Sequence, residues 1–196
     1  MPNGTIITSV TDAIAVVSQI VESAEKEVAW LVPRPSLIYA LQFGIIEQSK
    51  TLIQNGVRIR GIVDFSYPYI NVVRKLLDTG QDVCHVDNYR GMFMVIADAK
   101  SISSMSIITE SLSIDSPIVA FWSENPSYTE YLLSVFEQVW EQAIPATQRI
   151  EELLKRLPSD IYELEVHIIE QNTHRSSNSC RYHKHAQATD ADSTPT

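Results

Sequence analysis

The chain has 196 residues, 44% hydrophobic and 20% charged, which is enough apolar material for a folded core and excludes disorder over most of its length. Its 24 acidic and 15 basic residues give a formal net charge of −9, so we expect no direct contact with nucleic acid, whose binders rely on basic surface. Charges and prolines interrupt the apolar stretches, the N-terminus shows no basic leader, and two cysteines make no disulfide framework. We therefore expect a cytoplasmic protein that makes no membrane contact.

The first part of the chain alternates between helical and strand patterns. The expected elements are a helix over 11–26 capped by Asp12, a strand over 27–32, a long helix from Ser36 that ends at Asn55-Gly56, a strand over 57–65, a helix over 67–77 and a short strand over 82–86. This alternation predicts parallel strands joined by right-handed helical crossovers.

The pattern changes in the second part of the chain. Three β-rich runs, 92–97, 104–109 and 117–122, follow one another too closely for helical crossovers, so we expect antiparallel hairpins. A last helix is expected over 127–157, divided near Pro145. Its core-facing stripe is expected to be Tyr131, Leu132, Val135, Phe136, Val139 and Trp140.

The composition divides the chain into three parts. Residues 1–157 are expected to form the folded domain, and 158–170 are an extension that is either a strand or a helix. Residues 171–196 contain almost no aliphatic side chains, so we expect a disordered tail.

A parallel αβ half followed by antiparallel hairpins and a long helix resembles one repeat of the phospholipase D-like fold. The stretches IVESAEKEVAWLVP and IQNGVRIRGIVDF resemble the opening of archaeal TrmB-type sensor domains and of related sensor modules in archaeal histidine kinases. SYTEYLLSVFEQVWEQA resembles the helix that closes those modules, and the resemblance spans residues 11–157. It implies an α/β fold with one mixed sheet flanked by helices.

Catalytic phospholipase D-like proteins carry the motif H-x-K-x4-D, in which histidine attacks phosphorus and lysine holds phosphate oxygens. The matching stretch here is GMFMVIAD, residues 91–98, with Asp98 at the aspartate position. Gly91 and Phe93 replace the histidine and the lysine, so there is neither a nucleophile nor a charge for the phosphate. We therefore expect no catalysis by this mechanism, and the sequence calls for no cofactor.

The fold implies a crevice at the carboxyl ends of the parallel strands, where open α/β sheets bind ligands. The residues expected there are Arg34, Ser36, Tyr39, Asp64, Tyr67, Asn88, Arg90, Asp98, Glu110 and Trp122. We assign ligand contact to all of these except Asn88 and Glu110. Arg34 and the helix that begins at Ser36 together suggest an anion site, unless Ser36 only caps its helix and Arg34 is solvated.

Several other residues have structural interpretations. Asp98 and Asp64 also fit simple turn or network roles, and Trp122 fits either the core or a pocket lid. His85 is expected to be a hydrogen-bonded structural histidine. The tail carries His174, Cys180, His183 and His185, but two spaced ligand pairs around a foldable segment are missing, so we assign no metal site.

We thus expect a non-catalytic sensory or regulatory module that binds a small polar or anionic ligand. It would signal as a homodimer or by docking on a signalling protein, through the helix around Phe136 and Trp140. The alternative is a divergent, metal-dependent phosphodiester hydrolase that uses Asp64, Asp98, Glu110 or the tail histidines.

Overall fold

The structure is a computed structural model that describes residues 4–89, 92–104 and 117–156. The chain divides into two compact units, residues 1–151 and 152–196. The predicted boundaries at 157 and 170 are not tested by this division and stay predictions.

The described residues form one eight-stranded mixed sheet with the strand order β1-β7-β6-β5-β2-β3-β4-β8. The strands are β1 (Gly4–Ser9), β2 (Glu27–Pro33), β3 (Arg58–Asp64), β4 (Asp82–His85), β5 (Phe93–Ala97), β6 (Lys100–Ser104), β7 (Pro117–Ser123) and β8 (Ile144–Pro145). β2, β3 and β4 run parallel, and all other pairs are antiparallel. The predicted mixed α/β sheet is confirmed.

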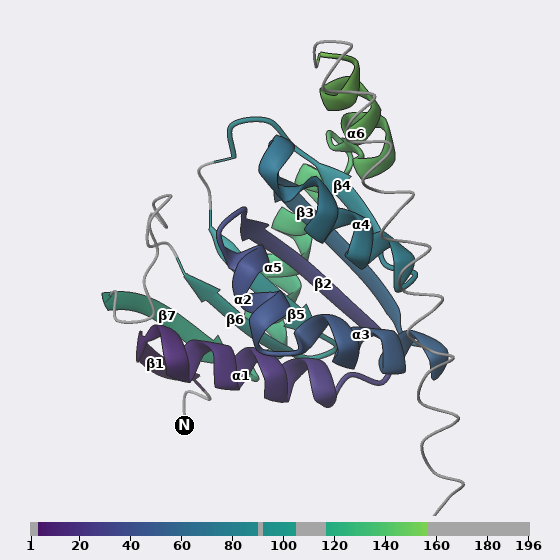
Figure 1. Cartoon of the computed structure of the whole chain (residues 1–196). Helices are drawn as coiled ribbons and strands as arrows, with labels where there is room; N and C mark the ends of the chain where they lie inside the picture. The colour runs from purple at the N-terminus through teal and green to yellow at the C-terminus, as the bar shows by residue number, and fades with distance from the viewer. Residues whose placement is uncertain (1–3, 90–91, 105–116, 157–196) are drawn as a thin grey trace, which may run out of the picture. The chain divides into compact units, whose positions relative to one another are not determined.

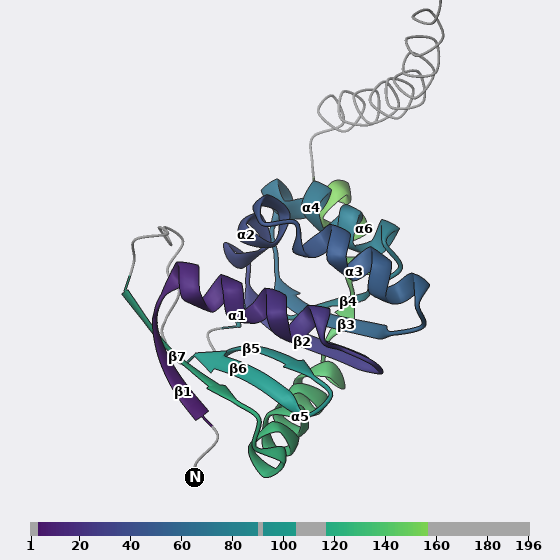
Figure 2. The same cartoon turned by 90° about the horizontal axis from the view of Figure 1, so that it is seen from below.

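Helices cover both faces of this sheet. They are α1 (Val10–Glu22), α2 (Ser36–Gln42), α3 (Ile45–Gln54), α4 (Ile70–Asp78), α5 (Pro126–Trp140) and α6 (Ala146–Lys155), and a 3-10 turn (Tyr67–Tyr69) precedes α4. Helices α1 to α4 lie on one face and α5 lies on the other, as Figure 1 shows and the view from below in Figure 2 makes plain.

The central strand β2 is buried on both faces, so its side chains contribute to two cores. Val28 and Trp30 pack with α1 residues such as Ile20. Ala29 and Leu31 point the other way and pack with Leu132 and Phe136 of α5. This explains why residues 27–33 read as a continuous apolar run and not as an alternating one.

Trp30 fits because the neighbouring strand carries a glycine. Gly61 pairs with Trp30 across β2 and β3, and a Cβ built on Gly61 would lie within 1.9 Å of the indole. The indole N–H of Trp30 donates to Gln81 Oε1 at 3.1 Å. The ring is thus held flat against the sheet, on the side that faces α1 to α3.

The start of the chain differs from the prediction. Residues 4–9 form β1, which was not expected, and Ser9 caps α1 in place of Asp12. The Ser9 hydroxyl accepts a hydrogen bond from the Asp12 N–H at 3.0 Å and donates to the Asp12 carboxylate at 2.7 Å. Asp12 therefore stands inside the first turn, where its charge suits the helix N-terminus.

The predicted helix from Ser36 to Asn55 is two helices. Gly44 has φ +73°, a left-handed conformation that ends α2 and starts α3. Ser36 does not cap α2, because Pro35 occupies the N-cap position and no side chain bonds there. The apolar residues keep helical spacing on both sides of Gly44, so their pattern alone does not show the break. The left-handed conformation of Gly44 ends one helix and begins the next.

The second half of the chain agrees with the prediction in part. A hairpin strand that was not predicted forms over Lys100–Ser104. Of the predicted strand over 104–109, residues 105–109 lie outside the described residues. The predicted division of the last helix near Pro145 is confirmed, because the two-residue strand β8 separates α5 from α6 and pairs with β4 at the edge of the sheet. Tyr131 is 58% exposed and leaves the core stripe, whereas Leu132 and Phe136 are fully buried.

Within the described part of the chain, no helix is both long and apolar enough to cross a bilayer.

Candidate functional site

The carboxyl ends of β2 and β3 meet at one edge of the sheet. Pro33 and Asp64 are register partners at the ends of these strands. β5 runs antiparallel to β2, so its first residue, Phe93, lies at the same edge and pairs with Ser104 at the end of β6. This is the edge at which a ligand crevice was predicted.

Three polar side chains meet at this edge. Arg34 Nη2 lies 3.2 Å from Asp64 Oδ2, and Arg34 Nη1 donates to Ser66 Oγ at 3.4 Å. The Arg34 side chain is 31% exposed and that of Asp64 is 15% exposed. We call Arg34, Asp64 and Ser66 the strand-end cluster. Its guanidinium and carboxylate cancel each other's charge, while part of each side chain still faces solvent.

This pairing changes the interpretation of Arg34 and Ser36 as an anion site. The N–H groups of Leu37 and Ile38 donate to Arg34 O and Pro35 O at 3.1 and 3.2 Å, so they are engaged in the first turn. α2 is also only seven residues long. The helix start therefore offers few free donors, and the Arg34 charge is already matched.

The predicted residues do not form one site. Ser36 and Tyr39 line a partly open apolar cavity and lie outside the strand-end cluster. Tyr67 begins the 3-10 turn one residue after Ser66 and is partly buried.

Trp122 lies on β7, opposite Ile102, where it packs against the core beneath α1. Asn88 is exposed, with φ +55°. Arg90, Gly91 and Glu110 fall outside the described residues.

Asp98 lies at the opposite end of the sheet, where it organises the turn before β2. Its carboxylate accepts the N–H groups of Glu25, Lys26 and Glu27 at 2.8, 3.2 and 3.1 Å. β2 has seven residues, so Asp98 and Asp64 are separated by roughly 20 Å of strand. The two carboxylates cannot share a proton or a metal, which removes this pair from the hydrolase alternative.

The first residue of β5, Phe93, occupies the lysine position of the motif, so no charged group stands there. Phe93 is half-buried and packs against the core cluster beneath α1. Tyr89 donates to Met92 O at 3.0 Å, and burial raises the pKa of Tyr89 to about 12, so its phenol stays neutral at physiological pH. In the described residues, no group of three or more His, Cys, Asp or Glu side chains is placed to hold a metal ion.

Sequence reasoning missed the cavity that Ser36 and Tyr39 line. It lies between the sheet and helices α1, α2 and α3 and has a volume of about 120 Å³. Its wall is almost entirely apolar and includes Val17, Trp30 and Phe93. No local sequence pattern predicts this cavity, because its existence depends on how three helices pack on one sheet.

His85 has the structural role that the sequence predicted. It is 1% exposed, its Nδ1 accepts from the Phe65 N–H at 3.2 Å, and its Nε2 lies 3.1 Å from Asp87 Oδ1. Arg149 Nη2 also bonds Asp87 Oδ1 at 3.1 Å. The ring thus fastens the ends of β3 and β4 side by side beside the strand-end cluster.

Of the docking surface predicted around Phe136 and Trp140, Phe136 is buried and Trp140 is only partly exposed. Phe136 is fully buried and stacks on Trp140 at 5.6 Å, and the Arg60 guanidinium lies 5.0 Å from the Phe136 ring. These aromatic rings pack against the sheet. Dimerisation and docking stay predictions, and Phe136 cannot provide their contact.

No protein-family model and no curated protein matches the sequence. Solved structures do match the fold. Nuc, a phospholipase D family member from Salmonella typhimurium, matches with a TM-score of 0.59 and 14% identity, over 74% of this chain and 98% of its own. NucT from Helicobacter pylori matches with a TM-score of 0.55 and 12% identity, over 72% and 98%.

A third match is TrmBL2, described as an archaeal chromatin protein with a novel mode of DNA binding. Its TM-score is 0.57 at 12% identity, over 73% of this chain and 54% of TrmBL2, so this chain spans about half the length of that protein. The expectation that this chain makes no direct contact with nucleic acid is therefore wrong. The same fold occurs in a DNA-binding protein, so a negative net charge does not exclude nucleic acid as a partner. The chain has a phospholipase D-like fold that resembles the TrmB type.

Proposed function

We propose that this chain is a non-catalytic phospholipase D-like regulatory module that binds a small polar ligand at the strand-end cluster. The observation that carries the proposal is the ion pair between Arg34 and Asp64, 3.2 Å long and partly open to solvent at the carboxyl ends of β2 and β3. The exposed remainder of the pair offers donors on the guanidinium and acceptors on the carboxylate.

The charge balance of the cluster indicates the kind of ligand. A phosphate or carboxylate that reached the remaining guanidinium N–H groups would lie beside the Asp64 carboxylate, whose like charge opposes its binding. A neutral ligand with hydroxyl groups can use both partners without separating them. We therefore favour a neutral, hydroxyl-bearing molecule over an anion.

The non-catalytic part rests on the residue at the lysine position of the motif. Phe93 is apolar and half-buried, and it supplies no charge for a transferring phosphoryl group. Asp98 is engaged by three backbone N–H groups at the far end of the sheet.

A thermal-shift screen tests the proposal. Polyols and sugars, nucleotides, inorganic phosphate and divalent metals are added to the purified chain, and the unfolding midpoint is measured for each. A selective rise with hydroxyl-bearing molecules, lost in Arg34→Ala and Asp64→Asn, supports it. The matched control is Arg58→Ala, which breaks an exposed 3.6 Å pair with Asp82 at the other end of the same strands.

Other outcomes overturn the proposal. A shift with phosphate alone contradicts the neutral ligand, and turnover of a generic phosphodiester that needs added metal favours the hydrolase alternative. Because TrmBL2 is a DNA-binding protein, duplex DNA is included as a probe by fluorescence anisotropy. DNA binding that survives Arg34→Ala, with no response to small molecules, replaces the small-ligand function.

A further inference from the structure

We propose that the cavity between α1, α2, α3 and the sheet is a second binding site, which takes a small apolar molecule the size of one aromatic ring or a short alkyl chain. The inference is independent of the strand-end cluster, since Arg34, Asp64 and Ser66 do not line this cavity.

The size of the cavity suits such a ligand. It has a volume of about 120 Å³ beneath the three helices and is partly open to solvent. A buried apolar cavity of about 150 Å³ engineered in another protein stays free of water and binds benzene. Native cores contain few voids larger than a water molecule, so a space of this volume departs from ordinary packing.

Several of the few polar side chains in the wall have hydrogen-bond partners inside the protein. Ser49 Oγ donates to Ile45 O at 2.8 Å, and Ser104 Oγ donates to Val119 O at 2.7 Å. Trp30 Nε1 donates to Gln81 Oε1 at 3.1 Å. A buried water needs two to four polar partners. The wall therefore suits an apolar occupant better than water or a polar ligand.

Helix α2 provides the side from which a ligand would enter. Leu37, Tyr39 and Ala40 line the cavity. On its outer side, Ile38, Leu41 and Phe43 are 38%, 39% and 42% exposed. α2 has seven residues, has no side-chain cap and ends against the left-handed Gly44. The helix is apolar both toward the cavity and toward solvent, so an apolar ligand that approaches from this side meets few polar groups.

The chain offers a matched pair of variants for the test. Ala13 lines the cavity and is 8% exposed, whereas Ala15 is exposed on the same helix. Ala13→Leu fills part of the cavity, and Ala15→Leu makes the same chemical change outside it. The unfolding midpoint is measured with and without benzene and indole as probes.

The proposal predicts that saturating benzene or indole raises the midpoint of the wild type and of Ala15→Leu by several degrees. Ala13→Leu should lose at least four fifths of that rise. If Ala13→Leu does not fold, Ala40→Leu, which enters the cavity from α2, replaces it. The proposal is overturned if neither probe shifts the wild type, or if the filled variant responds as strongly as Ala15→Leu.

Discussion

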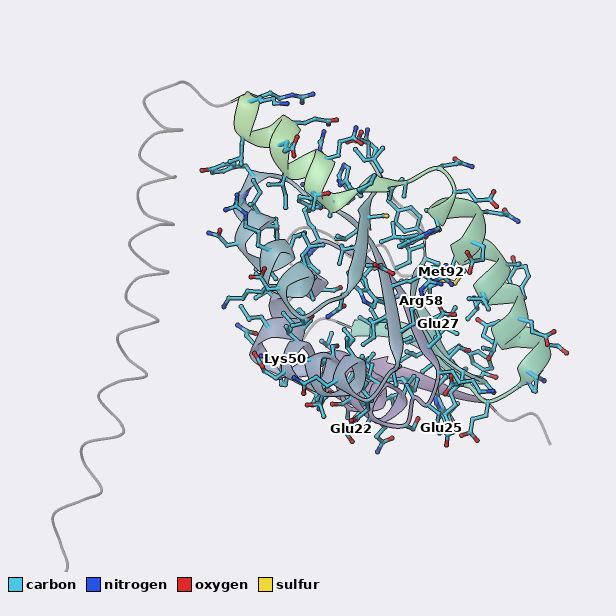
Figure 3. The ribbon with its side chains drawn as sticks, turned by 90° about the vertical axis from the view of Figure 1, so that its right-hand side faces the viewer. Glu22, Glu25, Glu27, Lys50, Arg58 and Met92 are labelled. Atoms are coloured by element: carbon cyan, nitrogen blue, oxygen red, sulfur yellow. The ribbon has the colours of Figure 1, made fainter. Side chains whose placement is uncertain are left out.

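Arg60 in the middle of β3 donates two hydrogen bonds to Glu137 near the end of α5, one of them 2.9 Å long between Nη1 and Oε2. The same guanidinium donates to Glu27 on β2 and lies beside the rings of Phe136 and Trp140. Only 6% of Arg60 is exposed. One buried cation therefore joins two parallel strands to the helix on the far face of the sheet. Glu27 is labelled in Figure 3, together with Arg58 from the neighbouring strand.

Removing this cation should be costly. Arg60→Ala removes the partner of Glu27 and Glu137 and the cation beside Phe136, and because both carboxylates are partly solvated we expect a loss of about 1.5–3 kcal/mol in the free energy of unfolding. Urea denaturation measures it. Arg58→Ala, two residues away in an exposed pair with Asp82, should cost less than about 0.5 kcal/mol. Equal costs for the two variants would contradict the role assigned to Arg60.

The same contact should make stability depend on acid. The hydrogen bond from Arg60 lowers the pKa of Glu137 relative to its ordinary value. A carboxyl group whose pKa is lower in the folded state stabilises it above the unfolded pKa, which is about 4.3 for glutamate. That contribution disappears as the pH falls through the folded pKa. Urea unfolding between pH 7 and pH 3 should therefore show a shallower acid loss in Glu137→Gln than in the wild type. An unchanged slope would contradict this.

Asp98 should matter for stability and not for ligand binding. Asp98→Ala removes the acceptor for three backbone N–H groups, and by analogy with a lost helix cap we expect a cost of about 1–2 kcal/mol. Asp98→Asn should cost less, because asparagine also tolerates the φ of +51° and keeps one acceptor oxygen. Any ligand-induced thermal shift should persist in Asp98→Asn, and its loss would place Asp98 in a binding site.

The break between α2 and α3 can be tested at Gly44. An alanine there would meet no neighbouring atom within 4 Å, so only the φ of +73° opposes it. Gly44→Ala should lower the free energy of unfolding by about 1 kcal/mol, and Gly44→Asn by less. Denaturant unfolding compares the two. A stabilising Gly44→Ala would mean that residues 36–54 form one continuous helix, as periodicity suggested.

Much of the architecture could be predicted because it follows from the spacing of apolar residues over short stretches of the sequence. The apolar run at 27–32 and the alternation of helix and strand up to 86 predict parallel strands, and the short gaps after Ala97 predict hairpins. β1 was missed because residues 4–9 pair only with β7, more than 100 residues later. The strand Lys100–Ser104 was missed because its serines carry little β-strand signal.

The candidate site divides in the same way. Arg34 and Asp64 could be placed at one sheet edge, because the carboxyl ends of parallel strands meet there. Their charged side chains marked them as candidate ligand contacts. Their mutual pairing could not be predicted, since it depends on side-chain reach across two strands. Asp98 and Trp122 were assigned to the crevice by motif position and strand end, yet the antiparallel register carries them away from it.

By itself, the sequence determined the fold class, the order of most elements and the loss of the histidine and lysine that phospholipase D chemistry requires, because each of these depends on residue type and short-range spacing. Tertiary structure alone decided that Arg34 is neutralised by Asp64, that Arg60 lies between two carboxylates and two aromatic rings, and that three helices leave an apolar cavity over the sheet. These features depend on distances between residues far apart in the chain, and those distances are set by packing.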